Sequence, residues 1–409
     1  MTNEVLQKIA SDEQNISSSN GLEPSLRFGH FVGNWKKSKL SSLFKKCLEK
    51  NENGLVDNVI CNSAKNGLMP QRDFFDKDIA NTENTNGYYI IQENDFVYNP
   101  RKSNEAPYGP ISMYKYKDKG IVSPLYLCFR ATKEIHPRYF EMYFKSSVWH
   151  KYIYFAGDSG ARYDRVSIKD DVFFEMPINI PSLPEQQKIA DFLSLIDQRI
   201  EKQRKLVENL KKYKRGYFQR IISSLETSSF ELKNIVDEYN AKSKIQNELP
   251  ILSSTLSGIK LQNDYFNKQA ASETTIGYKI VPFGYFTYRS MSDTGEFRFN
   301  LQNIIEKGIV SPAYPVFKVK EEYNAEFVEY ILNETDKIKS QLLVKKEGGT
   351  RYALSFSKFQ TLKIDLPTKS VQDKMVSQLR YANKILTNEE GVLSNLQKLK
   401  NGLLQQMFI

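Results

Sequence analysis

The chain has 409 residues, a length that exceeds one ordinary hydrophobic core and indicates two or three domains. Its 58 lysines and arginines outnumber its 48 aspartates and glutamates, and the formal net charge of +10 favours a polyanionic partner. No apolar run is long enough to cross a bilayer and the opening residues lack the apolar core of a signal peptide, so we expect a cytoplasmic protein with no membrane partner.

The first globular region is expected over residues 25–180, after a polar segment at 1–24 whose role the sequence leaves open. Short β-type runs such as GYYII, DFVYN and SPLYLCF alternate there with turn residues, and residues 137–153 follow a helical pattern. This mixture predicts an α+β globule.

A long helix is predicted over residues 181–225, because apolar residues recur there at alternating spacings of four and three. This heptad stripe consists of Ile189, Leu193, Ile196, Ile200, Val207, Leu210, Tyr217 and Ile221, interrupted by Gln203 and Lys214. Such a stripe is typical of a helix in a coiled coil.

The second half of the chain repeats this order, with a globule over residues 226–366, which includes a helical pattern over 325–343, and a long helix over 367–409. The second stripe consists of Met375, Leu379, Ala382, Leu386, Leu393, Leu396, Leu403 and Met407, interrupted by Glu389 and Lys400. The polar interruptions are either tolerated, half-solvated positions or residues that fix register or bind a partner subunit.

Short matching segments align the two halves of the sequence with each other. GIVSP occurs at 120–124 and at 308–312, and Ile90, Phe96 and Tyr98 correspond to Ile280, Phe286 and Tyr288. PSLPEQQKI (181–189) aligns with PTKSVQDKM (367–375), after which the offset of 186 holds without a gap to the end. A repeat near 188 residues is too long for a solenoid and indicates two domain-sized copies.

The predicted architecture is therefore α+β, with two mixed α/β globules, two long antiparallel coiled-coil helices and an internal pseudo-two-fold repeat. A helix of about 41 residues spans roughly 60 Å, so antiparallel pairing would hold the globules apart like a ruler.

We predict no catalytic centre and no metal site in this chain. The Asn99-Pro100 pair lacks the rest of a methyltransferase Asn-Pro-Pro-Tyr loop, and no GxxxxGK[ST] phosphate loop occurs. Cys47, Cys61 and Cys128 show no CxxC spacing, which predicts reduced thiols. His136 and His150 are expected to pack or to lie at the surface.

The stretches LPEQQKIADFL and LKKYKRG, their weaker second copies and the GIVSP words resemble the DNA-specificity subunit of type I restriction-modification systems. The resemblance covers the chain from Ser25 to Ile409. It departs from the family where LPEQQKI becomes PTKSVQDKM, which makes the second helix entry less typical.

The resemblance implies that the globules are target recognition domains, each reading one half of a bipartite asymmetric site in double-stranded DNA. The helices would dock two adenine methyltransferase subunits and, through them, two restriction subunits, the ATP-driven nucleases. S-adenosylmethionine, ATP and Mg would be used by those partners, and this chain would bind no cofactor.

Basic and aromatic residues in turn-rich segments are the candidate DNA contacts, because arginine, lysine and tyrosine bind phosphates and base edges. They are Arg101, Lys102, Arg162, Tyr163, Arg165, Arg289, Arg298, Lys345, Lys346, Arg351 and Tyr352.

Two other hypotheses remain open at this point. One is a coiled-coil scaffold that joins two protein-binding globules without DNA, and the other is an enzyme that acts alone on DNA. Salt-sensitive retention on nonspecific duplex would separate the scaffold from a DNA reader.

Overall fold

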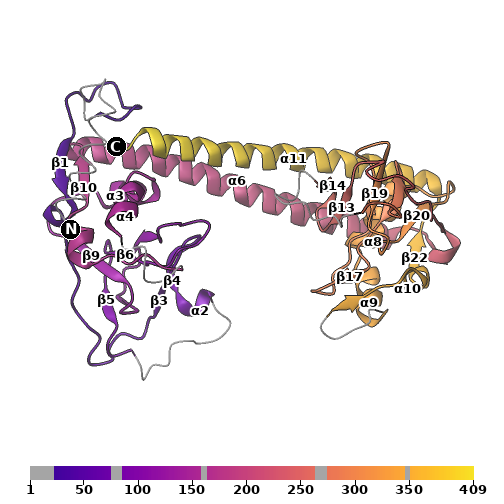
Figure 1. The fold of residues 1–409 in the computed structure, drawn as a ribbon, viewed down its shortest axis with the longest axis horizontal. Coiled ribbons are helices and arrows are strands. Elements are labelled where there is room, and N and C mark those ends of the chain that lie inside the picture. Colours follow the sequence, from indigo (N-terminus) through magenta and orange to yellow (C-terminus); the bar gives the residue numbers. More distant parts are fainter. Residues whose placement is uncertain (1–22, 75–84, 158–163, 263–273, 346–350) are drawn as a thin grey trace. The chain divides into compact units, whose positions relative to one another are not determined.

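A computed structural model describes residues 23–74, 85–157, 164–262, 274–345 and 351–409 (Figure 1). These residues form two compact units. Unit 1 consists of the described residues up to Arg204 together with Gly391–Ile409, and unit 2 consists of those from Lys205 to Glu390. Strands and short helices alternate in both units, which confirms the predicted mixed class. No helix in the described ranges is long and apolar enough to span a membrane.

Unit 1 contains a four-stranded antiparallel sheet with the strand order β2-β9-β6-β7, and β1 pairs with β10, β3 with β4, and β5 with β8. The strands are β1 (Lys36–Lys39), β2 (Phe44–Lys46), β3 (Ile60–Ser63), β4 (Gly67–Pro70), β5 (Tyr89–Ile91), β6 (Phe96–Tyr98), β7 (Ile111–Met113), β8 (Gly120–Val122), β9 (Leu127–Ala131) and β10 (Pro177–Ile180). The short helices are η1 (Leu40–Ser42), α2 (Gln71–Phe74), α3 (Pro137–Lys145), α4 (His150–Ala156) and α5 (Asp170–Phe174).

Unit 2 contains a four-stranded antiparallel sheet with the order β12-β20-β16-β18, and β11 pairs with β22, β13 with β14, β15 with β19, and β17 with β21. The strands are β11 (Ser228–Glu231), β12 (Val236–Glu238), β13 (Leu252–Thr255), β14 (Gly258–Leu261), β15 (Lys279–Pro282), β16 (Phe286–Thr287), β17 (Met291–Ser292), β18 (Asn300–Leu301), β19 (Lys307–Val310), β20 (Val316–Val319), β21 (Tyr352–Ala353) and β22 (Lys363–Leu366). The short helices are η3 (Leu232–Asn234), α8 (Ala325–Glu334), α9 (Asp336–Lys345) and α10 (Phe356–Gln360).

The two units repeat one topology, which confirms the internal duplication. Each four-stranded sheet has its counterpart, and Ile90 pairs with Ile121 as Ile280 pairs with Ile309. Each sheet buries phenylalanines: the ring centroids of Phe286 and Phe317 lie 5.0 Å apart in unit 2. Aromatic contacts of this kind stabilise a core beyond simple burial.

The helical patterns of each globule break where the sequence analysis expected continuity. The pattern over 137–153 forms α3 and α4, and the pattern over 325–343 forms α8 and α9. Backbone hydrogen bonding stops at Ser146, whose hydroxyl donates to the Tyr143 carbonyl, and Thr335 donates in the same way to Ile331. Hydroxyl side chains that bond to the preceding turn compete with the helix ladder.

The glycine of GIVSP is required by packing in both units. A Cβ on Gly120 would lie 2.7 Å from Ile60 Cγ1 and 2.8 Å from the Tyr114 hydroxyl oxygen. A Cβ on Gly308 would lie 2.6 Å from Leu252 Cδ1. The glycine of GIVSP is therefore present in both halves because its strand lies so close to a neighbouring strand that only glycine fits.

The two long helices are α6 (Leu183–Ser224, 42 residues) and α11 (Lys369–Gln406, 38 residues). Within each unit, half of one helix lies beside half of the other in antiparallel orientation (Figure 1). In unit 1, Ile189 and Leu193 share a core with Leu403 and Met407. In unit 2, Phe218 of α6 shares a core with residues of α11 that include Met375 and Leu379.

The apolar stripes lie mainly in the interior of this helix pair. The buried members are Ile189, Leu193, Ile200, Val207, Met375, Leu379, Leu386, Leu403 and Met407, and the half-buried members are Ile196, Leu210, Ile221, Ala382, Leu393 and Leu396, while Tyr217 is exposed. Gln203 is buried and Glu389 half-buried. The coiled-coil pairing expected from the heptads thus agrees with burial.

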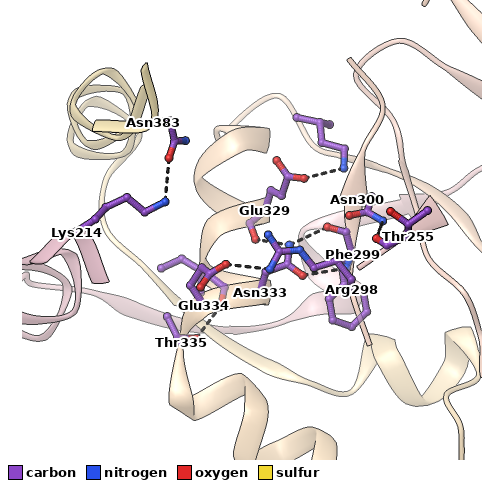
Figure 2. Close-up of polar contacts among 12 residues, drawn as sticks. Lys214, Thr255, Arg298, Phe299, Asn300, Glu329, Asn333, Glu334, Thr335 and Asn383 are labelled. Carbon is purple, nitrogen blue, oxygen red and sulfur yellow. Dashed lines mark hydrogen bonds and ion pairs between the residues drawn. The ribbon is translucent and has the colours of Figure 1, made fainter. Parts of the chain in front are cut away.

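The two lysines that interrupt the stripes have polar partners on the opposite helix. Lys400 forms an ion pair with Asp197 in unit 1, and Lys214 Nζ donates to Asn383 Oδ1 at 2.8 Å in unit 2 (Figure 2). Burial lowers the pKa of both ammonium groups. Because a buried charge without a partner is costly, these two contacts favour one register.

A glutamine connects each long helix to its globule. Gln186 accepts a hydrogen bond from His136 N at 3.0 Å and donates to the Pro181 carbonyl at 3.1 Å. Gln372 does the same with Asn324 N and the Pro367 carbonyl, both at 2.8 Å. Although the sequence KSVQD differs from LPEQQ, its Gln372 preserves this contact at the second helix entry.

The sequence difference at the two helix entries has a structural reason in unit 1. Glu185 is buried and accepts two hydrogen bonds from Arg27, at 2.7 and 2.8 Å, and one from Trp35. The adjacent Leu26 N donates to the Gln406 carbonyl at 2.9 Å, which fastens the start of the described chain to the end of α11. In unit 2 the residue aligned with Glu185 is Val371. There the chain enters the globule directly from α6, because only residues 225–227 separate the end of α6 from the start of β11.

Replacing Gly120 with alanine will destabilise unit 1 by about 1–3 kcal/mol, because the methyl group overpacks the contact with Ile60. Urea denaturation measures this as a lower midpoint. The matched control is Gly216→Ala in α6, where an added Cβ meets no atom within 4 Å and helix propensity adds about 1 kcal/mol. A Gly120→Ala variant as stable as the parent would contradict this packing role.

Candidate nucleic-acid interface

Three of the predicted DNA contacts come together in unit 1 on a short two-stranded ribbon. Lys102 N donates to the Asp164 carbonyl at 2.8 Å, and Val166 N donates to the Pro100 carbonyl at 2.9 Å. Arg101 and Arg165 are consequently opposite each other in an antiparallel bridge. The structure thus joins two segments that are 64 positions apart in sequence.

The local fold that holds this ribbon depends on Asn99 and Gly109. Asn99 Oδ1 accepts the Arg101 N–H at 3.1 Å, and Asn99 N donates to the Pro110 carbonyl at 3.0 Å. Gly109 has a φ of +82°, and a Cβ there would lie 2.2 Å from the Asn99 carbonyl oxygen. Only glycine meets both requirements, so the loop returns tightly against the ribbon.

The ribbon forms one wall of a cleft of about 510 Å³. Arg101, Lys102 and Arg165 line it, together with Cys61, Asn62, Ser63, Ala64, Gln71, Asn99, Pro100, Ser103, Glu105, Pro110, Ser123, Leu125 and Tyr126. A second cleft of about 460 Å³ shares Arg165 and Tyr126 and adds Lys46. Cations, an aromatic ring and polar side chains are the groups that bind nucleic acid.

The side-chain amides of Asn62 and Asn99 in this cleft form hydrogen bonds within the protein. Asn62 donates to the Val97 carbonyl at 2.8 Å and accepts from Ser112 at 2.7 Å, and Asn99 Nδ2 donates to the Asn62 carbonyl at 3.1 Å. These amides are therefore occupied by internal hydrogen bonds, whereas the exposed side chains of Arg101 and Lys102 face solvent.

Tyr126, Gln71 and Lys46 also line these clefts and were not among the predicted contacts. The sequence contained a signal for Tyr126, because GIVSPLY in the first half corresponds to GIVSPAY in the second half. Tyr314 is the residue that matches Tyr126. Gln71 also has a counterpart, because its N–H donates to the Val59 carbonyl as that of Gln262 does to the Ile251 carbonyl. Lys46 corresponds to Glu238 and has no such repeat.

In unit 2 several predicted contacts have partners within the protein. Arg298 Nη1 donates to Glu334 at 2.9 Å, and the neighbouring Phe299 backbone exchanges hydrogen bonds with the Asn333 side chain (Figure 2). Arg351 pairs with Asp293 at 2.7 Å. Arg298 thus helps to attach the start of β18 to α8.

The remaining candidates have varied positions. Arg289 is exposed, Tyr352 is half-buried in β21, and Lys345 Nζ donates to Thr361 at 2.6 Å. Arg162, Tyr163 and Lys346 lie outside the described residues. The DNA-contact role of all these residues stays a prediction.

The thiols and histidines lie in packed surroundings. Cys47 and Cys128 are buried, and burial raises the pKa of the Cys47 thiol to about 12. His150 packs on the Tyr108 ring with centroids 4.9 Å apart, and burial lowers the pKa of His136. Across the described ranges, no group of three potential metal ligands occurs.

Residues 33–211, which include the ribbon, the cleft and α6 as far as Lys211, match the model of the type I restriction modification DNA specificity domain. Residues 33–211 therefore belong to a domain of this specificity family. The match implies sequence-specific DNA recognition, and the basic ribbon and cleft lie within the matched residues.

Two solved structures resemble this chain in fold. One comes from a study of complex assembly and conformational transition of the type I restriction-modification system, with a TM-score of 0.58, 15% identity and coverage of 91% of this chain and 97% of that chain. The other is a type I restriction-modification S subunit from M. genitalium, with a TM-score of 0.52, 15% identity and coverage of 95% and 99%. No curated protein sequence matches the chain.

The paired and exposed cations will respond differently to substitution. Arg298→Ala will lower stability by up to about 1 kcal/mol, the range of a partly exposed ion pair, and leave DNA affinity unchanged. Lys102→Ala will keep stability and weaken binding to all duplexes alike, as removal of a phosphate contact does. Urea midpoints and fluorescence anisotropy with labelled duplex check both, and a DNA-binding loss confined to Arg298→Ala would contradict this assignment.

Proposed function

We propose that this chain is a non-catalytic subunit that reads a bipartite asymmetric site in duplex DNA, with one target recognition domain for each half-site. The observation that carries this proposal is that one strand topology occurs twice with different residues at the ribbon. Arg101 and Arg165 of unit 1 correspond to Met291 and Ala353, which are paired in the same way in unit 2. Two similar scaffolds with different contact surfaces suit two different half-sites.

The gap between the half-sites is set, in this proposal, by the long helices. Each of α6 and α11 runs without interruption from one unit into the other. At 1.5 Å per residue, the 42 residues of α6 rise by roughly 60 Å. A continuous helix resists bending, so the number of unspecified base pairs is fixed.

The helix pair also offers a docking surface for partner subunits. In unit 2, a groove of about 600 Å³ is lined by Leu210, Tyr213, Lys214, Tyr217, Phe218, Ser377, Gln378, Tyr381, Ala382, Ile385 and Leu386. Tyr213 and Tyr381 at its rim are 70% and 69% exposed. The equivalent positions of unit 1, Leu399 and Leu195, are 50% and 62% exposed.

These two exposed apolar pairs support the docking of two copies of one partner, because large exposed apolar residues at equivalent places mark interaction sites. In the proposal they bind two adenine methyltransferase subunits, which in turn hold two restriction subunits in the cytoplasm. S-adenosylmethionine, ATP and Mg belong to those subunits.

The proposal is tested by co-expressing the chain with a candidate methyltransferase subunit and mapping methylated adenines in the genomic DNA. The expected result is one motif with two specified blocks and a constant gap. Methylation of a single continuous motif would contradict the two-reader assignment. Absence of salt-sensitive duplex binding by the purified chain would favour the scaffold hypothesis.

A four-residue insertion after Arg204 will change the gap length or abolish methylation, because it lengthens α6 by about 6 Å and shifts the heptad phase. The same methylation map checks this. The control is a four-residue insertion after Asn53, in an exposed turn, which leaves the gap unchanged. An unaltered motif from the α6 insertion would overturn the helix-length assignment.

Replacing Tyr381 with serine will weaken binding of the methyltransferase subunit by roughly tenfold, since an exposed aromatic at an interface contributes more than 1 kcal/mol when buried. Isothermal titration against that subunit measures it. Lys384→Ser, an exposed change on the same helix outside the groove, is the control. Equal effects of the two changes would remove the groove from the interface.

A further inference from the structure

Arg101 and Arg165 form a like-charged cross-strand pair. They are directly opposite each other in the antiparallel bridge, and both line the 510 Å³ cleft. Side chains of directly opposed residues have Cβ atoms about 5 Å apart on the same face, where like charges repel. An anion between the two guanidinium groups would turn this repulsion into attraction.

A buried donor supplies a second, independent observation. Arg165 Nε is buried and makes no hydrogen bond with any residue that the structure describes. The adjacent Asp164 Oδ2 forms an ion pair with Arg165 Nε at 3.9 Å, a separation beyond hydrogen-bond distance. A buried donor without an acceptor is costly, so its presence calls for a ligand or another function.

Other arginines of unit 1 differ from Arg165. Arg130 donates two hydrogen bonds to Asp95, both at 2.7 Å, and Arg27 donates two to Glu185. Each of those guanidinium groups is paired in a bidentate manner with a carboxylate inside the fold. The Arg165 side chain is 34% exposed in the cleft, so its fork remains accessible to an external acceptor.

A phosphate suits this position better than a base edge does. Arg165 is recessed between the two clefts, whereas a residue that reads bases must project into a groove of the duplex. A DNA strand carries its phosphates on the outside of the duplex, so a phosphate can reach into an open cleft while the bases remain stacked. The exposed Lys102 beside the ribbon adds a further cation.

The second unit lacks this pair. The corresponding ribbon places Met291 opposite Ala353, and neither side chain carries a charge. Two cations lie two positions from this pair: Arg351 is paired with Asp293, and Arg289 is exposed. The two recognition units therefore differ in how they hold the backbone as well as in the surfaces they present.

We infer that Arg101 and Arg165 together bind one phosphate group of the DNA backbone, and that unit 1 anchors the complex by a contact that unit 2 lacks. This inference rests on the proposed function and adds the position and chemistry of a contact. It assigns Arg165 to affinity, and base preference to other residues.

The experiment uses the full chain, with binding to its selected duplex measured from 50 to 300 mM salt and base preference determined by selection from a randomised duplex pool. Arg165→Ala is expected to lower affinity roughly tenfold or more, since charge-assisted hydrogen bonds are the strong ones. The salt-dependence slope falls by about 1 and the selected motif stays the same. Arg165→Lys keeps the slope.

Arg101→Ala is expected to behave like Arg165→Ala. The control is Arg204→Ala, which removes one exposed cation paired with Glu201 on α6 and leaves the slope unchanged. Thermal midpoints check folding, and Arg165→Lys provides a second variant if the alanine variant unfolds. Parent-like affinity for Arg165→Ala, or a base preference relaxed at one position, would overturn the inference.

A free phosphate is a second possible source of the same chemistry. Inorganic phosphate at matched ionic strength should raise the thermal midpoint of the parent more than that of Arg165→Ala, because it presents the same group, and the DNA contact is assigned by the variant's loss of duplex affinity. A rise confined to the parent, with unchanged DNA binding by the variant, would assign the site to a small phosphate and overturn the DNA contact. Failure of the parent chain to prefer any duplex would refute the proposed function itself.

Discussion

The structure depends on the need of two apolar helix stripes to be buried against each other. Neither α6 nor α11 can cover its own stripe, and each compact unit contains half of both helices. The cores of the units include these halves, so a globule and its helices are stabilised together. Lys400 with Asp197 and Lys214 with Asn383 add polar contacts that disfavour other registers.

The duplicated units share the residues that position their strands and differ at the ribbon. Residues that position strands are shared, as with Gly120 and Gly308, or Gln186 and Gln372, because they satisfy steric and hydrogen-bonding needs that both units have. Residues at the ribbon differ, because nothing in the fold requires a particular side chain there. Under the proposed two-reader function, a change of specificity in one unit leaves the scaffold of the other unchanged.

Much of the fold was predictable from sequence because its signals are periodic or repeated. The heptads gave the long helices, and the fixed offset gave the duplicated topology. The break at Ser146 was not predictable from the apolar pattern, since a side-chain hydroxyl ends the helix locally. Two contacts were not predictable from the sequence, namely the pairing of Arg298 with Glu334 and the position of Arg101 opposite Arg165. Both depend on how segments distant in sequence align in the fold, and no local pattern of residues indicates that alignment.

Disulfide trapping tests the antiparallel helix pairing most directly. Under mild oxidation, the account predicts an intramolecular cross-link in Asp197→Cys with Lys400→Cys and in Lys214→Cys with Asn383→Cys, detected by mobility on a non-reducing gel. The parent chain, with Cys47 and Cys128 buried, is the control. Parallel stripes would instead join Asp197→Cys to Asn383→Cys, and that product without the other two would contradict the account.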